Sequence, residues 1–251
     1  MNNCKNDTKV QSVLAIPYKR TTCPTCGMAY SLQVRADVQS HKKYHTQFTS
    51  GVTWPQSLNM KPLSSFTIVR RERTNKLGKL KGSVSCKRYK VHIQTIDKLN
   101  KKHIEKVEQI LSMVNKELNA VEDSKEWASG KFESSKAFVV LVEGKAVGLC
   151  TTDSINGAKW MIYKSQSVVP NQNVKNVRIG ISRIWISTDW RQQGLAKEML
   201  NCVMKHSVYG QVLRKSQIAF SQPSYSGTLL AKSFNGVRHK SGEYLIPVYI
   251  Q

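Results

Sequence analysis

Acidic residues are scarce in this chain of 251 residues. It contains 16 Asp and Glu against 39 Lys and Arg, which gives a formal net charge of +23. This excess is far larger than solubility requires, so we expect an anionic partner, such as a nucleic acid or a polyphosphate cofactor. The charge alone does not distinguish between these two classes.

Long hydrophobic runs are also absent. No segment has the length of a membrane-spanning helix, and the opening MNNCKNDTKVQSV lacks the apolar core of a secretory signal, so we expect a protein of the cytosol or nucleus with no membrane partner. Cysteines number only six, and in a reducing compartment they do not indicate a disulfide framework. Hydrophobic residues make up 40% of the chain, which is enough for at least one full-sized core.

The two segments poorest in apolar pattern are predicted to be a tail and a linker. Residues 1–20 are polar and basic, which predicts a flexible tail. Within it, Gln11, Leu14 and Tyr18 have the spacing of a degenerate peptide that docks on the replication sliding clamp, although an ordinary tail can match so short a motif by chance. Residues 51–65 carry two prolines among serines, so we expect an irregular linker and a domain boundary there.

Between the tail and the linker, residues 21–50 contain a pair of cysteines and a pair of histidines. Cys23 and Cys26 are separated by two residues, and His41 and His45 by three, with fourteen residues between the pairs. Four such N and S ligands suit tetrahedral zinc, and a segment this short needs a metal because it cannot build a stabilising core. We predict a ββα-like zinc finger, the alternative being an accidental spacing. A lone finger reads only about three base pairs, so docking or general nucleic-acid contact is favoured over sequence-specific recognition.

Residues 66–251 have the pattern of a mixed α/β domain. Apolar residues at three- and four-residue spacing predict amphipathic helices, and β-branched or aromatic runs predict strands. The helices are expected at 101–119, 190–205 and 227–234, and the strands at 66–71, 89–96, 136–155 (a hairpin), 176–187, 217–221 and 243–250.

A glycine stands near the start of the predicted helix 190–205. The N-terminus of a helix presents unpaired N–H groups that suit a phosphate, and Gly194 leaves the backbone accessible. Arg191 to Ala196 reads R-x-x-G-x-A, the pyrophosphate-binding pattern of the GNAT acetyltransferase superfamily, between a long strand and an amphipathic helix. A glycine tolerated for helix packing is the competing interpretation.

The chain resembles one family closely, the sister-chromatid cohesion acetyltransferases that modify the cohesin ring. The resemblance rests on SRIWIS, RQQGLA, IAFSQPSYSGTLLAKSFNG and LIPVYI, with a single zinc finger upstream, and it points to the yeast branch. It implies a GNAT-type mixed central sheet flanked by helices, and transfer of acetyl groups from acetyl-CoA to lysines of the cohesin ATPase head. It also implies a nuclear, chromatin-associated protein that acts during DNA replication.

The resemblance also implies which residues hold acetyl-CoA. The backbone of Ile184, Trp185 and Ile186 would pair with the pantetheine arm, although core packing alone can explain Trp185. Ser182 matches a polar position near the substrate and is the candidate catalytic residue, or else an ordinary strand serine. The residues expected to hold the pyrophosphate and to line the other side of the cofactor are Gln192, Gln193, Gly194, Leu195, Ala196, Lys197, Ser224, Tyr225 and Ser226.

The general base is not identified, because the sequence departs from the family pattern. Asn201 and Gln222 stand where animal relatives have a glutamate and an aspartate, and neither can act as a base. A water, the substrate or another carboxylate must take the proton. The carboxylates considered are Asp153, Glu198 and Glu243, with Tyr225 as a candidate acid.

These departures keep a second function open, a zinc-finger DNA or chromatin binding module whose acetyltransferase domain is inactive. An intact phosphate loop weighs against it, since a pure binder does not need one. The surplus of basic residues suggests DNA or DNA-bound cohesin as a further partner. We expect a basic face, or simply a solvated surface, formed by Lys76, Lys79, Lys81, Lys87 and Arg88.

Overall fold

The computed structural model describes residues 19–74, 83–120 and 135–250. The chain divides into two compact units, the first ending at His45 and the second beginning at Thr46. Within the described ranges, no helix is long and apolar enough to cross a membrane.

The first unit has two short strands followed by a helix. β1 (Arg20–Thr22) and β2 (Ala29–Ser31) form an antiparallel pair, and α1 (Arg35–Ser50) follows. This order confirms the predicted ββα arrangement. Val38, three residues before His41, has the sequence position at which a zinc finger keeps its small apolar core, but its side chain is exposed.

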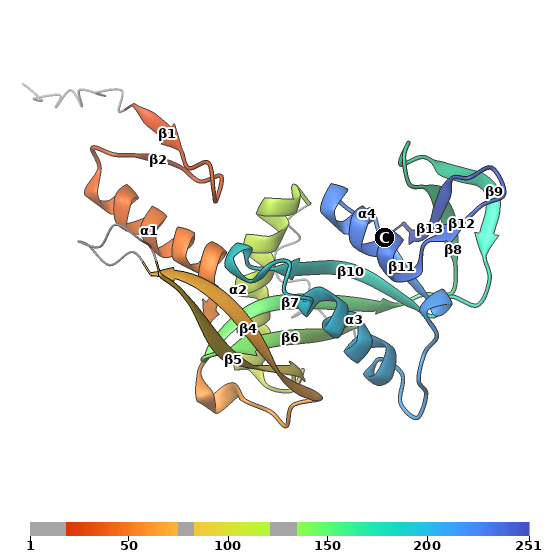
Figure 1. The fold of residues 1–251 in the computed structure, drawn as a ribbon, viewed down its shortest axis with the longest axis horizontal. Coiled ribbons are helices and arrows are strands. Elements are labelled where there is room, and N and C mark those ends of the chain that lie inside the picture. Colours follow the sequence, from red (N-terminus) through yellow and green to blue (C-terminus); the bar gives the residue numbers. More distant parts are fainter. Residues whose placement is uncertain (1–18, 75–82, 121–134, 251) are drawn as a thin grey trace, which may run out of the picture. The chain divides into compact units, whose positions relative to one another are not determined.

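The second unit is built on one large mixed sheet (Figure 1). Its strands are β3 (Val52–Thr53), β4 (Ser64–Thr74), β5 (Ser83–Thr95), β6 (Lys136–Val142), β7 (Lys145–Ser154), β8 (Ala158–Ile162), β9 (Val168–Val174), β10 (Ile179–Ile186), β11 (Ile218–Ser221), β12 (Val237–Arg238) and β13 (Tyr244–Tyr249). The helices are α2 (Lys101–Leu118), α3 (Leu195–His206) and α4 (Tyr225–Asn235), with 3-10 turns at Gln56–Leu58, Thr188–Trp190 and Lys215–Gln217.

The strand order is β4-β5-β6-β7-β10-β11-β13-β8-β9, with β3 also on β7 and β12 on β13. Among the described strands, only the pairs β10–β11 and β11–β13 are parallel. β10 therefore lies in the middle of the sheet, as its apolar residues on both faces predict. Strands β8 and β9 occupy part of 156–175, a segment for which the sequence predicted no element.

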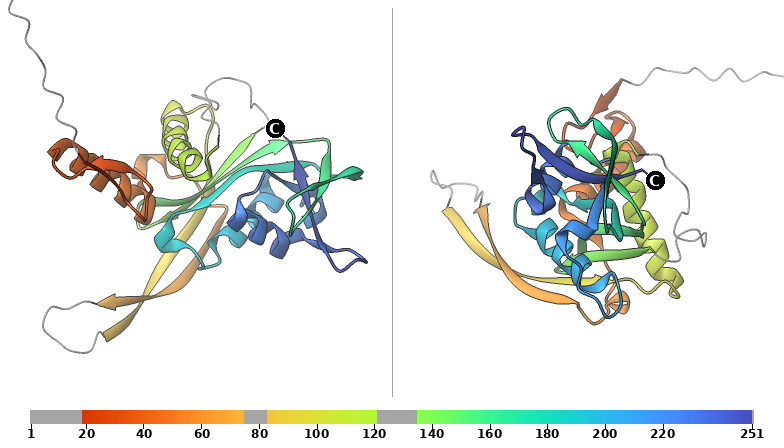
Figure 2. Two further views of the ribbon diagram at one scale, coloured as in Figure 1. Left: turned by 90° about the horizontal axis from the view of Figure 1, so that it is seen from above. Right: turned by 90° about the vertical axis from the view of Figure 1, so that its right-hand side faces the viewer.

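Helices cover both faces of this sheet. α2 lies on one face, and α3 and α4 lie on the other (Figure 2). Successive side chains of a strand point to opposite faces of the sheet, so apolar strand residues pack against the helices on each face. On the α3 side, Phe138 and Val140 of β6 pack in a cluster with Met199 of α3 and Phe234 of α4. The amphipathic spacing in 101–119 produced the helix it predicts, since Val107, Ile110 and further apolar residues of α2 are buried.

The predicted linker 51–65 is ordered and belongs to the second unit. β3 pairs with the start of β7, and Trp54 and Leu58 are buried. The carbonyl of Leu58 accepts hydrogen bonds from the Gln94 side chain at 3.0 Å and from Trp54 Nε1 at 3.3 Å, and it lies 3.0 Å from His103 Nε2. Two prolines shape the segment without preventing it from packing on the domain.

The basic stretch 72–87, between the first two predicted strands, is expected from its composition to be an exposed hairpin or loop. The hairpin alternative is confirmed, because β4 and β5 pair antiparallel continuously from Ser64 to Thr74, with residues 75–82 outside the described ranges. One helix start differs from the prediction. The helix predicted to begin at Trp190 begins at Leu195 instead. Trp190 is buried, but it ends a 3-10 turn, and Gly194 at φ 78° separates that turn from α3.

Candidate active site and metal site

The four predicted metal ligands come together in the first unit. Cys23 and Cys26 lie in the turn between β1 and β2, and His41 and His45 lie one turn apart on α1. One ligand atom of each lies within 4.8 Å of the corresponding atoms of the other three, and Cys23 Sγ is 3.4 Å from His45 Nδ1. The imidazole of His41 stacks on Tyr30 with ring centroids 3.9 Å apart, which fixes its direction.

The donor set fits zinc. His41 Nε2 is buried without a hydrogen-bond partner, as expected of a nitrogen reserved for a metal ion. Hydrogen bonds from the backbone N–H groups of Cys26 and Thr25 lower the pKa of the Cys23 thiol to about 6, which favours the thiolate that zinc binds. Four protein ligands leave no open coordination position, so this site is structural.

The second site begins where two parallel strands separate. β10 and β11 pair only from Ile179 to Ile181, and beyond that point β10 keeps its partner on the β7 side alone. The N–H of Ser187 donates to β7, so by alternation Ile184 and Ile186 turn their backbone groups to the open edge. An extended ligand can add there as a strand, whereas the backbone of Trp185 faces β7.

Ser182 occupies a β-bulge at the point of separation. The register between β10 and β7 shifts from Ile181 opposite Thr152 to Arg183 opposite Thr151, which leaves Ser182 as the extra residue. A bulge redirects a side chain out of the regular alternation. Ser182 Oγ lies 2.8 Å from Thr151 Oγ1, on the face of the sheet that α2 covers.

The start of α3 forms the second wall of the site. Gly194 is its N-cap at φ 78°, and Gln192 is also left-handed at φ 61°, so the chain turns sharply into the helix. α2 and α4 are capped by the side chains of Asn100 and Ser224, but Gly194 offers no side chain. The first N–H groups of α3 are thus left for a ligand, and an anion is what they suit.

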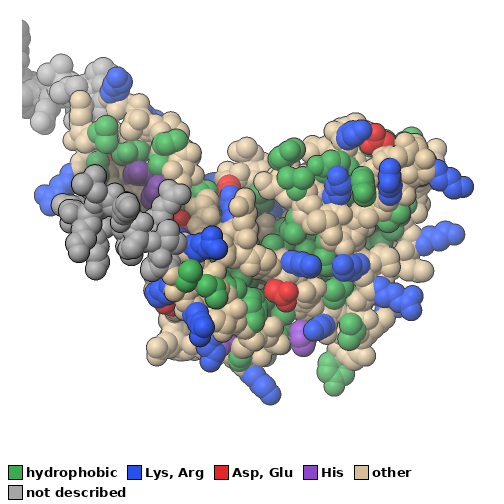
Figure 3. Space-filling view, in the orientation of Figure 1, with side chains coloured by type: hydrophobic (Ala, Val, Ile, Leu, Met, Phe, Trp, Pro, Cys, Tyr) green, Lys and Arg blue, Asp and Glu red, His purple; other side chains and the backbone are tan. Residues whose placement is uncertain are grey.

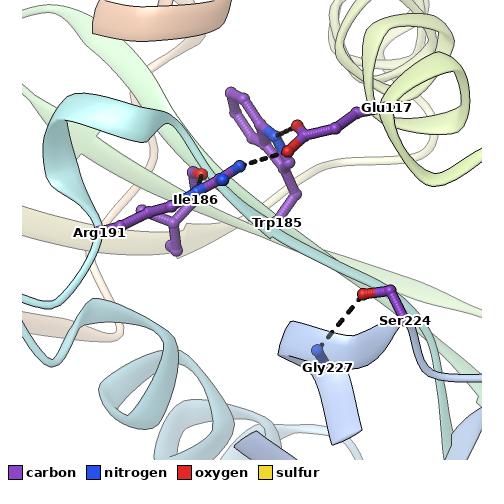
Figure 4. A network of polar contacts seen from close by, with 6 residues as sticks. All are labelled: Glu117, Trp185, Ile186, Arg191, Ser224 and Gly227. Atoms are coloured by element: carbon purple, nitrogen blue, oxygen red, sulfur yellow. Dashed lines mark hydrogen bonds and ion pairs between the residues drawn. The ribbon is translucent and has the colours of Figure 1, made fainter. Parts of the chain in front are cut away.

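Arg191, the first residue of the phosphate-loop pattern, is held by protein groups (Figure 4). Its Nε donates to the carbonyl of Ile186 at 2.8 Å, and its guanidinium pairs with Glu117 of α2 at 2.6 Å. The other oxygen of Glu117 accepts from the indole of Trp185 at 2.5 Å. This clamp fastens the end of α2 to β10 and to the loop before α3.

These elements surround one cavity of about 1430 Å³. Such a volume is ample for a ligand the size of acetyl-CoA. Every residue predicted to contact the cofactor lines it except Gln193, and Ser182 lines it as well. Leu195 is buried and contributes through its backbone, while Ser224, which caps α4, and Tyr225 and Ser226 are exposed at the cavity rim.

The cavity distinguishes among the candidate acids and bases. Asp153 lines it, but Glu198 and Glu243 do not; Glu243 pairs with Lys164 at 3.0 Å. Asn201 interacts with Glu198 along α3 and is also outside the lining, whereas Gln222 lines the rim. Tyr225 has 72% of its side chain exposed.

Glu117 and Tyr249 are among the lining residues that sequence reasoning missed. Glu117 lies near the end of an amphipathic helix, where its polar position predicts only solvent exposure. Tyr249 lies in the last strand, and its hydroxyl donates to Asp153 at 2.8 Å, 96 residues away. Glu117 belongs to no local motif, and Tyr249 lies within the LIPVYI segment, but the spacing of residues around either one gives no sign of its distant partner.

The cavity fits the chemistry of acetyl transfer. The open edge of β10 suits a pantetheine arm, and the uncapped start of α3 suits a pyrophosphate. A bound acetyl thioester would supply the acetyl group, and Ser182, Asp153 and Tyr249 line the same cavity.

Comparison with known proteins agrees with both sites. Residues 175–244 match the family model described as ESCO1/2 acetyl-transferase, and residues 11–47 match the zinc-finger of acetyl-transferase ESCO. The chain is 45% identical to N-acetyltransferase ECO1 of Debaryomyces hansenii over 98% of this chain and 90% of the relative. It is 33% identical to N-acetyltransferase ECO1 of Saccharomyces cerevisiae, with 92% and 89% covered.

A solved structure shares the fold. The xEco2 acetyltransferase domain bound to a CoA conjugate superposes with a TM-score of 0.51 and 23% identity, covering 65% of this chain and 95% of that domain. The GNAT-type sheet expected from the sequence is therefore confirmed, and zinc and acetyl-CoA are the groups that the two sites accept. The chain belongs to the ECO1/ESCO family of N-acetyltransferases.

Proposed function

We propose that this acetyltransferase modifies lysines of the cohesin ATPase head and so establishes sister-chromatid cohesion during DNA replication. The cavity supports an amine acceptor, because Ser182 and Asp153 approach from the α2 face while the predicted cofactor residues lie along β10 and α3. The identity of the protein substrate rests on the family resemblance.

The test is transfer of labelled acetyl groups from acetyl-CoA to a purified cohesin ATPase head. Modified lysines are mapped by mass spectrometry, and histones and serum albumin serve as competing acceptors. The Gly194→Asp variant is the matched control, because it places a carboxylate at the uncapped start of α3. We expect head lysines to be labelled preferentially by the wild type and not by the variant. Preferential labelling of the other acceptors would refute cohesin as the substrate.

The second candidate function is a DNA or chromatin binding module that has lost catalysis, as Asn201 and Gln222 suggest. The cavity weighs against it, since it retains an open strand edge and an uncapped helix start. Acetyl-CoA binding by calorimetry separates the two. A wild-type protein that fails to bind acetyl-CoA would favour the binding module.

We also propose contact with DNA and a nuclear, chromatin-associated location. Figure 3 shows Lys and Arg side chains spread over one face with few acidic ones among them. Of the five residues expected to form a basic face, Lys76, Lys79 and Lys81 lie outside the described residues. Lys87 pairs with Glu143 at 3.1 Å, and Arg88 is exposed. Reversing the charge of all five residues should reduce the retention of the protein on DNA at low salt. Unchanged retention would mean that these basic residues form only a solvated surface.

The proposed contact with the replication sliding clamp depends on Gln11–Tyr18, which lies outside the described residues. Alanine at Gln11, Leu14 and Tyr18 should abolish capture of the purified clamp. Capture at wild-type strength would leave the tail without this role.

A further inference from the structure

A line of polar groups crosses the α2 face of the sheet at the point where β10 and β11 separate. Ser182 Oγ lies 2.8 Å from Thr151 Oγ1, and the hydroxyl of Tyr249 interacts with Ser182 and donates to Asp153 Oδ2 at 2.8 Å. The other carboxylate oxygen of Asp153 accepts from Ser135 Oγ at 3.0 Å. All five residues except Thr151 line the acetyl-CoA cavity.

Tyr249 reaches Asp153 because small residues let its ring cross the sheet. Tyr249 is on β13, two strands away from β10, and Asp153 on β7 is directly opposite Gly180. A Cβ on Gly180 would lie 2.5 Å from Tyr249 Cζ, so only glycine fits under the ring. Ala219 of β11 packs in the same cluster as Tyr249. The trough made by Gly180 and Ala219 fixes the position of the hydroxyl.

Among the residues that the structure describes, the carboxylates of Glu117 and Asp153 line the cavity. Glu117 is engaged by the guanidinium of Arg191 and by the indole of Trp185. Asp153 accepts a hydrogen bond from a hydroxyl group on each of its two carboxylate oxygens. Asp153 is also next to the bulge where the predicted catalytic residue lies. Of the three carboxylates that the sequence offers as a base, only Asp153 lines the cavity.

We propose that Asp153 is the general base that takes the proton of the acceptor lysine, and that Tyr249 is the residue that positions it. The N–H bond of the lysine ammonium breaks, and an O–H bond forms on the carboxylate of Asp153. The freed nitrogen lone pair forms the new C–N bond, the C–S bond of the acetyl thioester breaks, and the sulfur leaves with the electron pair of that C–S bond. The attacking nitrogen then gives up a second proton, which passes through water to the departing sulfur, so that the products are a neutral amide and a thiol. The proton on Asp153 then passes to water in the open cavity.

Tyr249 cannot replace Asp153 in this step. Burial and the neighbouring Asp153 carboxylate raise the pKa of the Tyr249 hydroxyl, so it stays protonated and acts as a hydrogen-bond donor. Its proton anchors one oxygen of Asp153 while Ser135 anchors the other. The inference rests on the acetyltransferase activity of the family and does not depend on cohesin as the substrate.

The experiment compares isosteric carboxylate variants on whichever lysine acceptor the wild type acetylates. Asp153→Asn should lower kcat at least about 100-fold at pH 7, the usual contribution of a general base, with an unchanged Kd for CoA. Glu198→Gln and Glu243→Gln are matched controls outside the cavity and should retain wild-type rates. A wild-type rate for Asp153→Asn, or a comparable loss in either control, would overturn the assignment.

The pH profile separates a base from a structural role. The titratable or charged groups around Asp153 and Tyr249 are Cys150 on β7, Arg183 on β10 and Tyr249 itself. Without the base, only lysine that is already neutral can react, so the defect of Asp153→Asn should shrink as pH approaches the lysine pKa of about 10.4. A defect that stays constant from about pH 7 to about pH 10 would contradict the proposal.

Two further variants keep the proposal testable if Asp153→Asn is unstable. Tyr249→Phe retains the ring and removes the hydroxyl, so kcat should fall about tenfold while CoA still binds; one bond to a charged group typically contributes about 1.5 kcal/mol. Gly180→Ala displaces the same ring and should lower kcat in the same direction. Full activity in both variants would show that Tyr249 does not position the base.

Discussion

Replacing Gly194 by alanine should separate the two reasons for a glycine at the start of α3. The residue has φ 78°, and a Cβ there would meet no atom within 4 Å. The left-handed conformation costs an L-residue about 1–2 kcal/mol, so the free energy of unfolding should fall by that amount. The added methyl group would also stand among the N–H groups that a pyrophosphate needs. Loss of about 1.4 kcal/mol of that interaction corresponds to a tenfold rise in the Kd for CoA.

Gly210 provides the matched control for this change. It has φ 69°, a Cβ on it would likewise meet no atom within 4 Å, and it does not line the cavity. Gly210→Ala should therefore lose similar stability by urea denaturation but bind CoA with wild-type affinity in calorimetry at fixed salt. Equal CoA affinities for the two variants would refute the idea that the backbone at Gly194 meets the cofactor, and unequal stabilities would refute the strain argument.

The zinc site, the Glu117 clamp and the cysteines each give a further prediction. Removing zinc with a chelator should make residues 19–45 sensitive to trypsin. The thermal transition of the second unit should be retained, because that unit has a core of its own. Unfolding of both units together would contradict this prediction. Glu117→Gln should lower the free energy of unfolding by less than about 1 kcal/mol, since Arg191 is partly exposed, and a larger loss in urea would mean that the clamp carries more than its ion pair. Cys86 is exposed and should react with Ellman's reagent in the native protein. Cys150 is buried, which raises the pKa of its thiol, so it should react only after unfolding. Modification of Cys150 in the native protein, mapped by mass spectrometry, would contradict its burial.

Local patterns were sufficient for the parts of the fold whose determinants are close in sequence. Two short spacings predicted the four zinc ligands, and the apolar periodicity of α2 predicted its length to within one residue. The long apolar strand that became β10 was predicted to be central for the same reason. In each case the residues that decide the structure lie within a few turns of one another.

The missed features depend on contacts between distant segments or on backbone conformation. The predicted helix begins at Trp190, but apolar periodicity does not reveal the positive φ of Gly194 that separates Trp190 from α3. Glu117 and Trp185 are 68 residues apart, and Tyr249 meets Asp153 only through the register of four strands. The linker was mispredicted because prolines indicate a break in local pairing, which does not prevent Trp54 from being buried.

The open edge of β10 has a consequence for how this family can change. An unpaired strand recognises its ligand through N–H and C=O groups, and every residue except proline carries both. Side chains at Ile184 and Ile186 can therefore be exchanged for others that pack on the sheet, without altering what the backbone offers. Selection for cofactor binding should instead exclude proline at these two positions and retain the glycine that begins α3. Sequence identity along β10 is then a poor measure of whether a distant relative still binds the cofactor.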